Sequence, residues 1–307
     1  MVKKIVLVIV GPTAVGKTDF CVQLAQRYGI EVVSADSRQF YKEMAIGTAK
    51  PSPEEIRGVP HYLIDHISIH EDYNVAKYEK DALTCLQNIF KKSNTALLTG
   101  GSGLFVKAIC DGIDEMPPVK AGIREHLNQI HQHDGLAPLL EELAQADPDY
   151  YQKVDQQNHM RVIRALEVIR STGKTFSSFR SGKKVTRSFE VIKVGLNRDR
   201  EELYDRINRR MDLMLEMGLV EEAKALYPYK HLSALKTVGY QELFDFWDGK
   251  YDWDQAVELL KQNSRRYAKR QLTWFRKDQE IKWFHPQELE KVQAYLETIA
   301  PSHFKQA

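Results

Sequence analysis

Short apolar runs alternate with amphipathic segments over the first third of the chain. Ile5–Val10 is a continuous apolar run rich in β-branched residues, typical of a parallel strand that is covered on both faces. Short runs of the same kind are Ile30–Ser34, Tyr62–Ile67 and Thr95–Thr99. Helical spacing of apolar residues occupies Thr18–Tyr28 and Ala76–Lys92. This alternation predicts an α/β fold, a doubly wound parallel sheet with helices on both faces.

A different pattern occupies the middle of the chain. Met116-Pro117-Pro118 marks a boundary, and from Ala121 to about Phe179 the spacing is helical, with no β-type run. Val191–Leu196 is β-type again, so the sheet resumes there. We therefore predict a core of residues 1–116 and 188–307, interrupted by a helical insertion domain at 117–187. Helical spacing then dominates the rest of the chain, at Leu203–Met217, Glu221–Leu226, Trp253–Lys277 and Pro286–Ile299.

Composition agrees with a globular protein of about two domains. The chain has 307 residues, of which 43% are hydrophobic and 28% charged. The net charge of +2 hides an asymmetry, because residues 1–155 carry 16 Lys and Arg against 21 Asp and Glu, whereas residues 156–307 carry 28 against 21. Basic runs at 156–193 and 259–277 account for the positive half. Such runs are commonly solvated helix faces, but they also suit a polyanion such as RNA.

The cysteines and apolar runs limit the cellular setting. Cys21, Cys85 and Cys110 are far apart without C-x-x-C spacing, which excludes a disulfide scaffold and disfavours structural zinc. No apolar run approaches the length of a membrane span. The sequence therefore predicts a cytoplasmic protein with reduced thiols and no membrane association.

The strongest motif is a phosphate-binding loop. Gly11-Pro12-Thr13-Ala14-Val15-Gly16-Lys17-Thr18 fits G-x-x-x-x-G-K-[ST] and lies between a predicted strand and a predicted helix. The glycines allow backbone N–H groups to converge on phosphate oxygens, and the following helix adds its positive N-terminus. Lys17 supplies a charge, and the Thr18 hydroxyl suits Mg²⁺. The loop predicts a di- or triphosphate ligand, with ATP as the default.

Two features beside this loop leave its chemistry open. The strand Thr95–Thr99 runs into Gly100-Gly101-Ser102-Gly103 and lacks the terminal carboxylate that supports Mg²⁺ in many ATPases, although Asp65 could substitute. Small-molecule kinases also have degenerate forms of this strand. Asp36 follows the second β-type run, at the strand edge where α/β proteins bind ligands. It could act as a base, help hold a metal, or cap a helix.

The motifs that follow resemble a known family. The run from Asp36 to Pro51, DSRQFYKEMAIGTAKP, resembles that of tRNA dimethylallyltransferases, also called tRNA isopentenyltransferases. Further matches occur in order at Pro60–Asp65, Gly100–Phe105, Arg164–Val168, Thr172–Lys174, Val238–Tyr240 and Tyr267–Arg276, so that the resemblance covers about residues 5–284. Ser102, Phe105, Glu43 and Ala45 depart from the family's usual Thr, Tyr, Gly and Asp.

The resemblance implies a reaction. The family transfers a dimethylallyl group from dimethylallyl diphosphate to the exocyclic amine of adenosine 37 in tRNA, next to the anticodon, and releases pyrophosphate. The phosphate loop, residues 11–18, would then hold the diphosphate, with Lys17 and a Mg²⁺ at Thr18 stabilising the leaving group. Asp36 matches the general base, and Ser102 matches a hydroxyl that lines the same site.

The resemblance also implies where tRNA binds. The insertion domain would clamp the anticodon stem, and the target base would flip into the site. The matched contact positions are Asp36, Ser37, Arg38, Gln39, Ser102, Arg124, Met160, Arg161, Val162, Ile163, Arg164, Lys236, Thr237, Val238, Gly239, Tyr240 and Gln241. Arg265, Arg266, Lys269 and Arg270 could face either the pyrophosphate or the tRNA. We expect a monomer.

Two other classes of function compete with the prenyltransferase. A P-loop kinase of a small metabolite, such as a nucleoside, would turn over ATP but leaves the two basic runs unexplained. A non-catalytic RNA-binding protein that uses a nucleotide as a switch would show nucleotide-dependent affinity without chemical change in the RNA. The prenyltransferase accounts for the phosphate loop, the glycine-ended strand, Asp36 and the basic half together.

Overall fold

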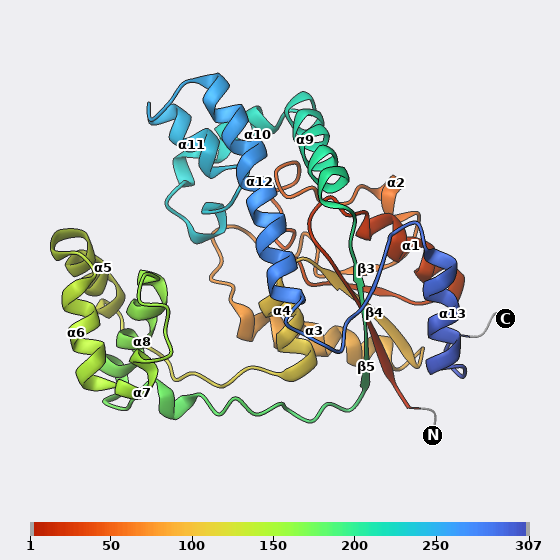
Figure 1. Cartoon of the computed structure of the whole chain (residues 1–307), viewed down its shortest axis with the longest axis horizontal. Coiled ribbons are helices and arrows are strands. Elements are labelled where there is room, and N and C mark those ends of the chain that lie inside the picture. Colours follow the sequence, from red (N-terminus) through yellow and green to blue (C-terminus); the bar gives the residue numbers. More distant parts are fainter. Residues whose placement is uncertain (1–2, 305–307) are drawn as a thin grey trace. The chain divides into compact units, whose positions relative to one another are not determined.

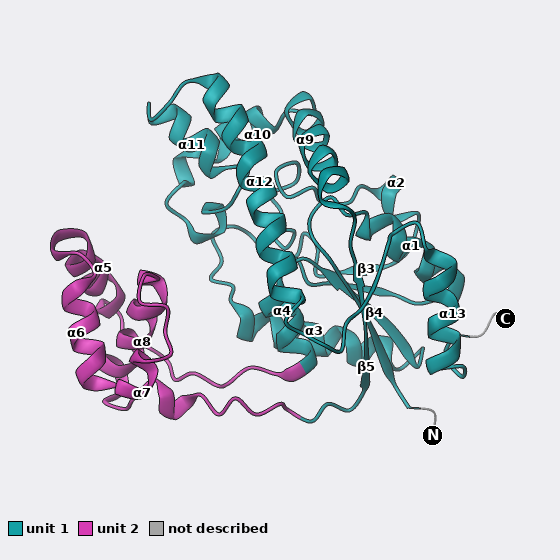
Figure 2. Ribbon diagram, viewed as in Figure 1, with its two compact units in different colours: residues 1–110, 186–307 teal, residues 111–185 magenta. Residues whose placement is uncertain are grey.

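A computed structural model describes residues 3–304 of the chain (Figure 1). The chain forms two compact units, one made of residues 1–110 and 186–307 and the other of residues 111–185 (Figure 2). None of the helices described between residues 3 and 304 combines the length and apolar character needed to cross a membrane.

The larger unit is built on a parallel sheet. Within residues 3–304 the sheet has six strands in the order β3-β2-β4-β1-β5-β6. The strands are β1 (Ile5–Val10), β2 (Val32–Ser34), β3 (His61–Tyr62), β4 (Thr95–Gly100), β5 (Glu190–Leu196) and β6 (Lys282–Phe284). Within the described residues, all neighbouring strands of this sheet pair in parallel. The predicted α/β class with a parallel sheet is confirmed.

Helices follow the strands in the doubly wound manner. The helices of this unit are α1 (Lys17–Tyr28), α2 (Pro53–Ile56), α3 (Val75–Ile89), α4 (Gly103–Asp111), α9 (Arg200–Glu216), α10 (Leu219–Leu226), α11 (Gln241–Trp247), α12 (Trp253–Phe275) and α13 (Leu289–Ile299). Short 3-10 turns occupy Tyr227–Tyr229 and Ser233–Leu235. The predicted helices agree with these bounds to within a few residues.

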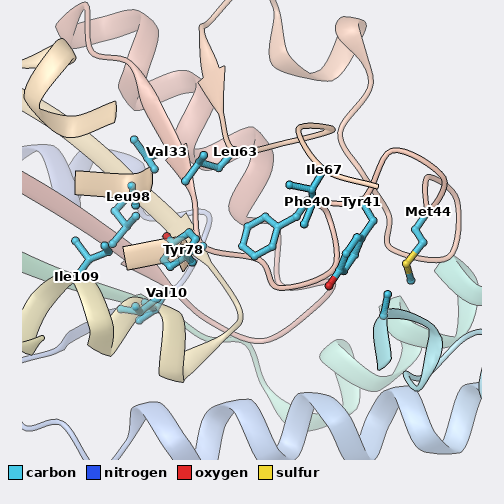
Figure 3. Close-up of a cluster of buried hydrophobic side chains, with 14 of the residues drawn as sticks. Val10, Val33, Phe40, Tyr41, Met44, Leu63, Ile67, Tyr78, Leu98 and Ile109 are labelled. Carbon is cyan, nitrogen blue, oxygen red and sulfur yellow. The ribbon is translucent and has the colours of Figure 1, made fainter. Parts of the chain in front are cut away.

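Alternate side chains of β1 enter two different cores, as a sheet covered on both faces requires. Val6, Val8 and Val10 belong to one buried cluster, and Ile5, Leu7 and Ile9 belong to the other. The first cluster extends beyond the strands along the segment after β2, where the rings of Phe40 and Tyr78 stack 5.3 Å apart (Figure 3). This packing fixes the backbone that follows Asp36.

One predicted strand was wrong in its extent, and one strand of the sheet was not predicted. The expected strand Tyr62–Ile67 is limited to β3, because Leu63 and Asp65 have positive φ angles of 60° and 53°, which break an extended backbone. Ile67 forms only an isolated bridge with Tyr41. β6 lies in a region where we expected helices and short breaks. Its three residues pair only with the end of β5, so it carries too little pattern to be read from the sequence.

The smaller unit is helical, as predicted. It contains α5 (Ile123–Asp134), α6 (Ala137–Ala146), α7 (Pro148–Tyr151), α8 (His159–Thr172) and a 3-10 turn at Ser177–Phe179, with no strand between residues 111 and 185. Its own core includes Leu127, Leu143 and Leu166. The unit spans 111–185, whereas the sequence placed the insertion at 117–187. A backbone hydrogen bond of 2.8 Å from Val185 N to Asp111 O joins the two ends of the unit. The unit therefore begins before the Met116-Pro117-Pro118 segment that the sequence indicated as its boundary.

Candidate active site

A cavity of about 820 Å³ opens in the larger unit, beyond the carboxyl ends of β1, β2 and β4. Its walls come from the phosphate loop, the segment after β2, the loop 45–51, α9, the segment 237–239 and α12. Ligands of open α/β sheets bind at this edge, because loops and helix N-termini converge there.

The phosphate loop forms the first wall. Ala14 and Gly16 have φ angles of 62° and 105°, which turn the loop back over the N-terminus of α1. A Cβ on Gly11 would lie 2.6 Å from the Leu196 carbonyl oxygen, so only glycine fits between β1 and β5 at that point. The members that line the cavity are Thr13, Ala14, Gly16, Lys17 and Thr18. Gly11, Pro12 and Val15 are buried and contribute through their backbone.

Lys17 carries its charge inside this loop. Its Nζ donates to the carbonyl oxygens of Gly11 and Pro12, at 2.9 and 2.8 Å. Burial lowers the pKa of Lys17 to about 8, and the nearby Asp36 carboxylate opposes that shift. An ammonium group held this way gains strongly from an anion beside it, because an isolated buried charge is costly. Lys17 is therefore set to bind a diphosphate.

Three arginines that the sequence analysis missed hold the same loop from outside. Arg198 Nε donates to Val15 O and Arg206 Nε to Ala14 O, each at 2.9 Å. Arg210 Nη1 donates to Thr13 Oγ1 at 3.2 Å. Arg206 and Arg210 are one turn apart on α9 and both line the cavity. That i, i+4 spacing was the available signal, and it adds positive charge where a diphosphate would lie.

Asp36 follows the end of β2 by two residues, and it lines the cavity. Its Oδ1 accepts from Arg38 N at 3.0 Å, which forms an Asx turn. No helix is described between Ala35 and Ser52, so the helix-cap alternative is wrong. The turn fixes the carboxylate at the cavity wall, within electrostatic reach of Lys17 and Arg210.

Ser102 joins this group through hydrogen bonds. Its Oγ accepts from Ser37 N at 2.9 Å and donates to Ser37 Oγ at 3.0 Å. The Tyr267 hydroxyl from α12 also hydrogen-bonds with Ser102, and burial, with Asp36 nearby, raises the pKa of Tyr267 to about 12. Tyr267 lines the cavity, so a neutral phenol lies beside the Asp36 carboxylate. The sequence analysis did not single out Tyr267.

Gln271, one turn beyond Tyr267 on α12, links the phosphate loop to the glycine loop after β4. Its Oε1 accepts from Thr13 N at 2.8 Å, and its Nε2 donates to Gly101 O at 3.0 Å. A Cβ on Gly101 would collide with that amide nitrogen. Gly101 and Gly103 have no room for a side chain because Gln271 and Trp274 of α12 pack on them, and Gly100 has none because it lies against the Ala35 backbone.

The remaining predicted residues of the larger unit divide into two groups. Arg38 and Gln39 line the cavity, and each is held by a backbone carbonyl, Arg38 Nη1 by Ala234 O at 2.9 Å and Gln39 Nε2 by Ala49 O at 3.0 Å. Thr237, Val238 and Gly239 also line it, whereas Lys236 is exposed, Tyr240 is fully buried and Gln241 begins α11.

α12 presents its basic residues away from the cavity. Ser264, Tyr267 and Gln271 share the face that lines it. Arg265, Arg266, Lys269 and Arg270 are absent from that lining, and the last two border a separate shallow depression with Trp274 and Lys277. This placement favours a contact with a polyanion outside the cavity over a contact with a diphosphate inside it.

In the smaller unit, Arg124 and Arg164 converge on the buried carboxylate of Glu167. Arg124 contributes bonds of 2.9 and 2.7 Å, and Arg164 one of 2.7 Å. Met160 and Arg161 are exposed. Val162 and Ile163 belong to the core of this unit, so their side chains cannot meet RNA as the resemblance implied.

A divalent cation fits the cavity through the phosphate loop. Thr18 lines it, in the position that supplies a hydroxyl to Mg²⁺ in such loops. Among residues 3–304, no group of three or more His, Cys, Asp or Glu side chains could hold a metal by itself. Asp65, the alternative carboxylate, binds the Lys50 ammonium and does not line the cavity. Mg²⁺ normally keeps waters and substrate phosphates, which suits this donor set.

The fold and the cavity together define a P-loop protein with a carboxylate and a phosphate loop lining one cavity. Residues 39–278 match the family model described as IPP transferase. A tRNA dimethylallyltransferase from Cytophaga hutchinsonii is 50% identical over 296 residues, which are 96% of this chain and 97% of that protein.

Solved structures of proteins with this activity have a similar fold. The full-length tRNA isopentenylpyrophosphate transferase from Bacillus halodurans superposes with a TM-score of 0.72 at 37% identity, covering 96% of each chain. A eukaryotic dimethylallyltransferase acting on tRNA gives a TM-score of 0.79 at 26% identity, covering 97% of this chain and 77% of that one. The chain belongs to the tRNA dimethylallyltransferase family of prenyltransferases, which confirms the resemblance seen in its sequence.

Proposed function

We propose that this enzyme transfers a dimethylallyl group from dimethylallyl diphosphate to the exocyclic amine of adenosine 37 in tRNA and releases pyrophosphate. Family membership supports the reaction class. The observation that carries the chemistry is that Asp36 and the phosphate loop line the same cavity. One substrate binds at each side of that cavity.

The phosphate loop handles the leaving group. Cleavage of the allylic C–O bond leaves its electron pair on the diphosphate, and that developing charge is stabilised by loop N–H groups, Lys17 and the α9 arginines. These groups lie on or beside the loop already, so little reorganisation is needed. Mg²⁺ at Thr18 would neutralise further charge on the phosphate oxygens when it is bound.

Asp36 handles the incoming amine. The nitrogen lone pair is delocalised into the adenine ring, so a hydrogen bond to a carboxylate increases its nucleophilicity. As the new C–N bond forms, the amine proton passes to Asp36. The Asx turn with Arg38 holds the carboxylate, and Tyr267 lines the wall next to it. Ser102 does not line the cavity itself but hydrogen-bonds with Tyr267 and Ser37. A substrate packed there also keeps water from the allylic carbon.

The tRNA partner explains the basic surfaces. The target base must leave the anticodon loop to reach a cavity of this kind. Arg38, Gln39 and the segment 237–239 line the cavity where the flipped nucleotide would enter. Arg161, Met160 and the outward face of α12 supply contacts to the rest of the RNA. We propose a monomer that acts in the cytoplasm, where its tRNA substrate is found.

Two labelled donors distinguish this function from a small-molecule kinase. In the first reaction the protein and Mg²⁺ are incubated with unmodified tRNA and labelled dimethylallyl diphosphate. In the second, the protein and Mg²⁺ are incubated with nucleosides and γ-labelled ATP. We expect label on adenosine in the first reaction and none transferred in the second. Phosphate transfer from ATP, without prenylated adenosine, would refute the proposal.

A further inference from the structure

Glu222 lies on α10, outside the lining of the cavity, yet it binds a loop that forms part of the wall. Its Oε2 accepts from the backbone N–H groups of Ala45 and Ile46, at 3.0 and 2.8 Å. Its Oε1 accepts from Gly47 N at 2.9 Å. Three successive amides that converge on one carboxylate form an anion-binding nest, and bonds of this kind are charge-assisted.

The same carboxylate holds a second segment. The Tyr240 hydroxyl donates to Glu222 Oε1 at 2.6 Å, and Tyr240 is completely buried. Burial, together with Glu222, raises the pKa of Tyr240, so the phenol stays protonated as a donor. Its ring packs on Gly47, where a Cβ would lie 2.5 Å from a ring carbon. Glu222 therefore ties residues 45–47 to the segment that ends at Tyr240.

Both tied segments belong to the cavity wall. Residues 45–51 and 237–239 line it, and Gln39 reaches the first of them through the carbonyl oxygen of Ala49. None of the four hydrogen bonds to Glu222 involves the phosphate loop or its arginines. The carboxylate thus fixes one part of the site and leaves the diphosphate part to other residues.

We propose that Glu222 is a positioning residue for RNA, one that acts through the 45–47 loop and Tyr240 without touching either substrate. The inference rests on the proposed function for the identity of the ligand. A glutamine at this position keeps one acceptor oxygen but turns an amide N–H₂ toward backbone donors and the Tyr240 hydroxyl. The loop then loses its fixed geometry, and RNA binding weakens, whereas diphosphate binding does not.

The test compares Glu222→Gln with Glu222→Asp and with the matched control Glu221→Gln on the same helix. Three quantities are measured: KM for tRNA, the Kd of an anticodon stem-loop RNA, and the Kd of inorganic pyrophosphate with Mg²⁺. We expect Glu222→Gln to weaken RNA binding about tenfold or more, since each charge-assisted bond lost is worth at least that factor. Glu222→Asp should recover part of the loss, and the control should match the wild type.

Gly47→Ala provides an independent variant if Glu222→Gln fails to fold. It pushes Tyr240 away from the loop without changing the carboxylate, and we expect the same weakening of RNA binding. Unchanged RNA binding in both variants would overturn the inference, and so would a parallel loss of pyrophosphate binding. If the wild-type protein binds RNA but transfers no prenyl group, the proposed function is refuted but the inference about Glu222 is not. The RNA and pyrophosphate affinities of the variants would still test the role of Glu222.

Discussion

At the scale of single residues, Lys17 shows how burial and binding oppose each other. The folded state lowers the pKa of Lys17 from 10.5 to about 8, so the folded protein binds fewer protons than the unfolded chain between these values. The free energy of unfolding therefore rises with pH across that window. The reason is that the unfolded chain binds more protons there, so a lower proton concentration disfavours the unfolded state. The charge that a diphosphate needs disappears over the same range.

We therefore expect affinity for pyrophosphate to fall as the pH rises above about 8. Lys17→Met should bind more weakly at neutral pH and lose this component of the pH dependence. Calorimetric titrations of both proteins across this range provide the measurement. Pyrophosphate itself titrates identically in both experiments, so the difference between the curves belongs to Lys17. Parallel curves would contradict the assignment.

Glu167 gives the corresponding prediction in the smaller unit. Burial alone would raise its pKa, but hydrogen bonds and charges from Arg124 and Arg164 outweigh burial, and the pKa is lowered below 4.5. The contribution to stability is thus present above the unfolded pKa and is lost as the pH falls through the lower folded value. Glu167→Gln should lower the thermal midpoint at neutral pH, with a gap that closes in acid. A gap that is constant with pH would show that the ion pairs contribute nothing.

At the scale of elements, α12 brings together parts of the site that are distant in sequence. Gln271 contacts both the phosphate loop and Gly101, and Gly101 has no space for a side chain. We expect Gly101→Ala to lower the free energy of unfolding by about 1–3 kcal/mol, the usual cost of overpacking. Urea unfolding measures this cost. Gln271→Ala in the same background should relieve most of the clash, and a double variant no better than Gly101→Ala would contradict this explanation.

Most strands of the sheet could be predicted from the sequence, whereas several residues of the site could not. β1, β2 and β4 were predictable because they are apolar runs, and since parallel strands end at one edge, Asp36 was expected near the phosphate loop. The place of Ser102 in the site came from the family resemblance. Arg210, Tyr267 and Gln271 were missed because their roles depend on how α9 and α12 pack, and not on any local pattern. The side chains of Val162 and Ile163 lie in the core of the smaller unit, which the matched motif could not show because it does not tell which side chains point inward.

At the scale of the whole molecule, positive charge is unevenly divided along the chain. Residues 156–307 carry the excess of Lys and Arg, and Arg161 is exposed on α8. Binding of a polyanion through such residues releases counterions and weakens with salt. We expect Arg161→Ala to reduce the slope of log affinity for tRNA against log salt by about 0.7, as for one phosphate contact. Lys291→Ala on α13 is the control, and an equal slope in the two variants would contradict a role for Arg161.

The central claim is that one cavity holds a diphosphate on its loop and an adenosine amine at Asp36. Asp36→Asn keeps the size of the side chain and an oxygen for the bond from Arg38, but it removes the base. The most direct test is single-turnover transfer to unmodified tRNA, with the modified nucleotide located by mass spectrometry. We expect the wild-type protein to add one dimethylallyl group to adenosine 37, and Asp36→Asn to do so about 10²- to 10⁴-fold more slowly while it still binds pyrophosphate. Transfer at the wild-type rate by Asp36→Asn would contradict the account.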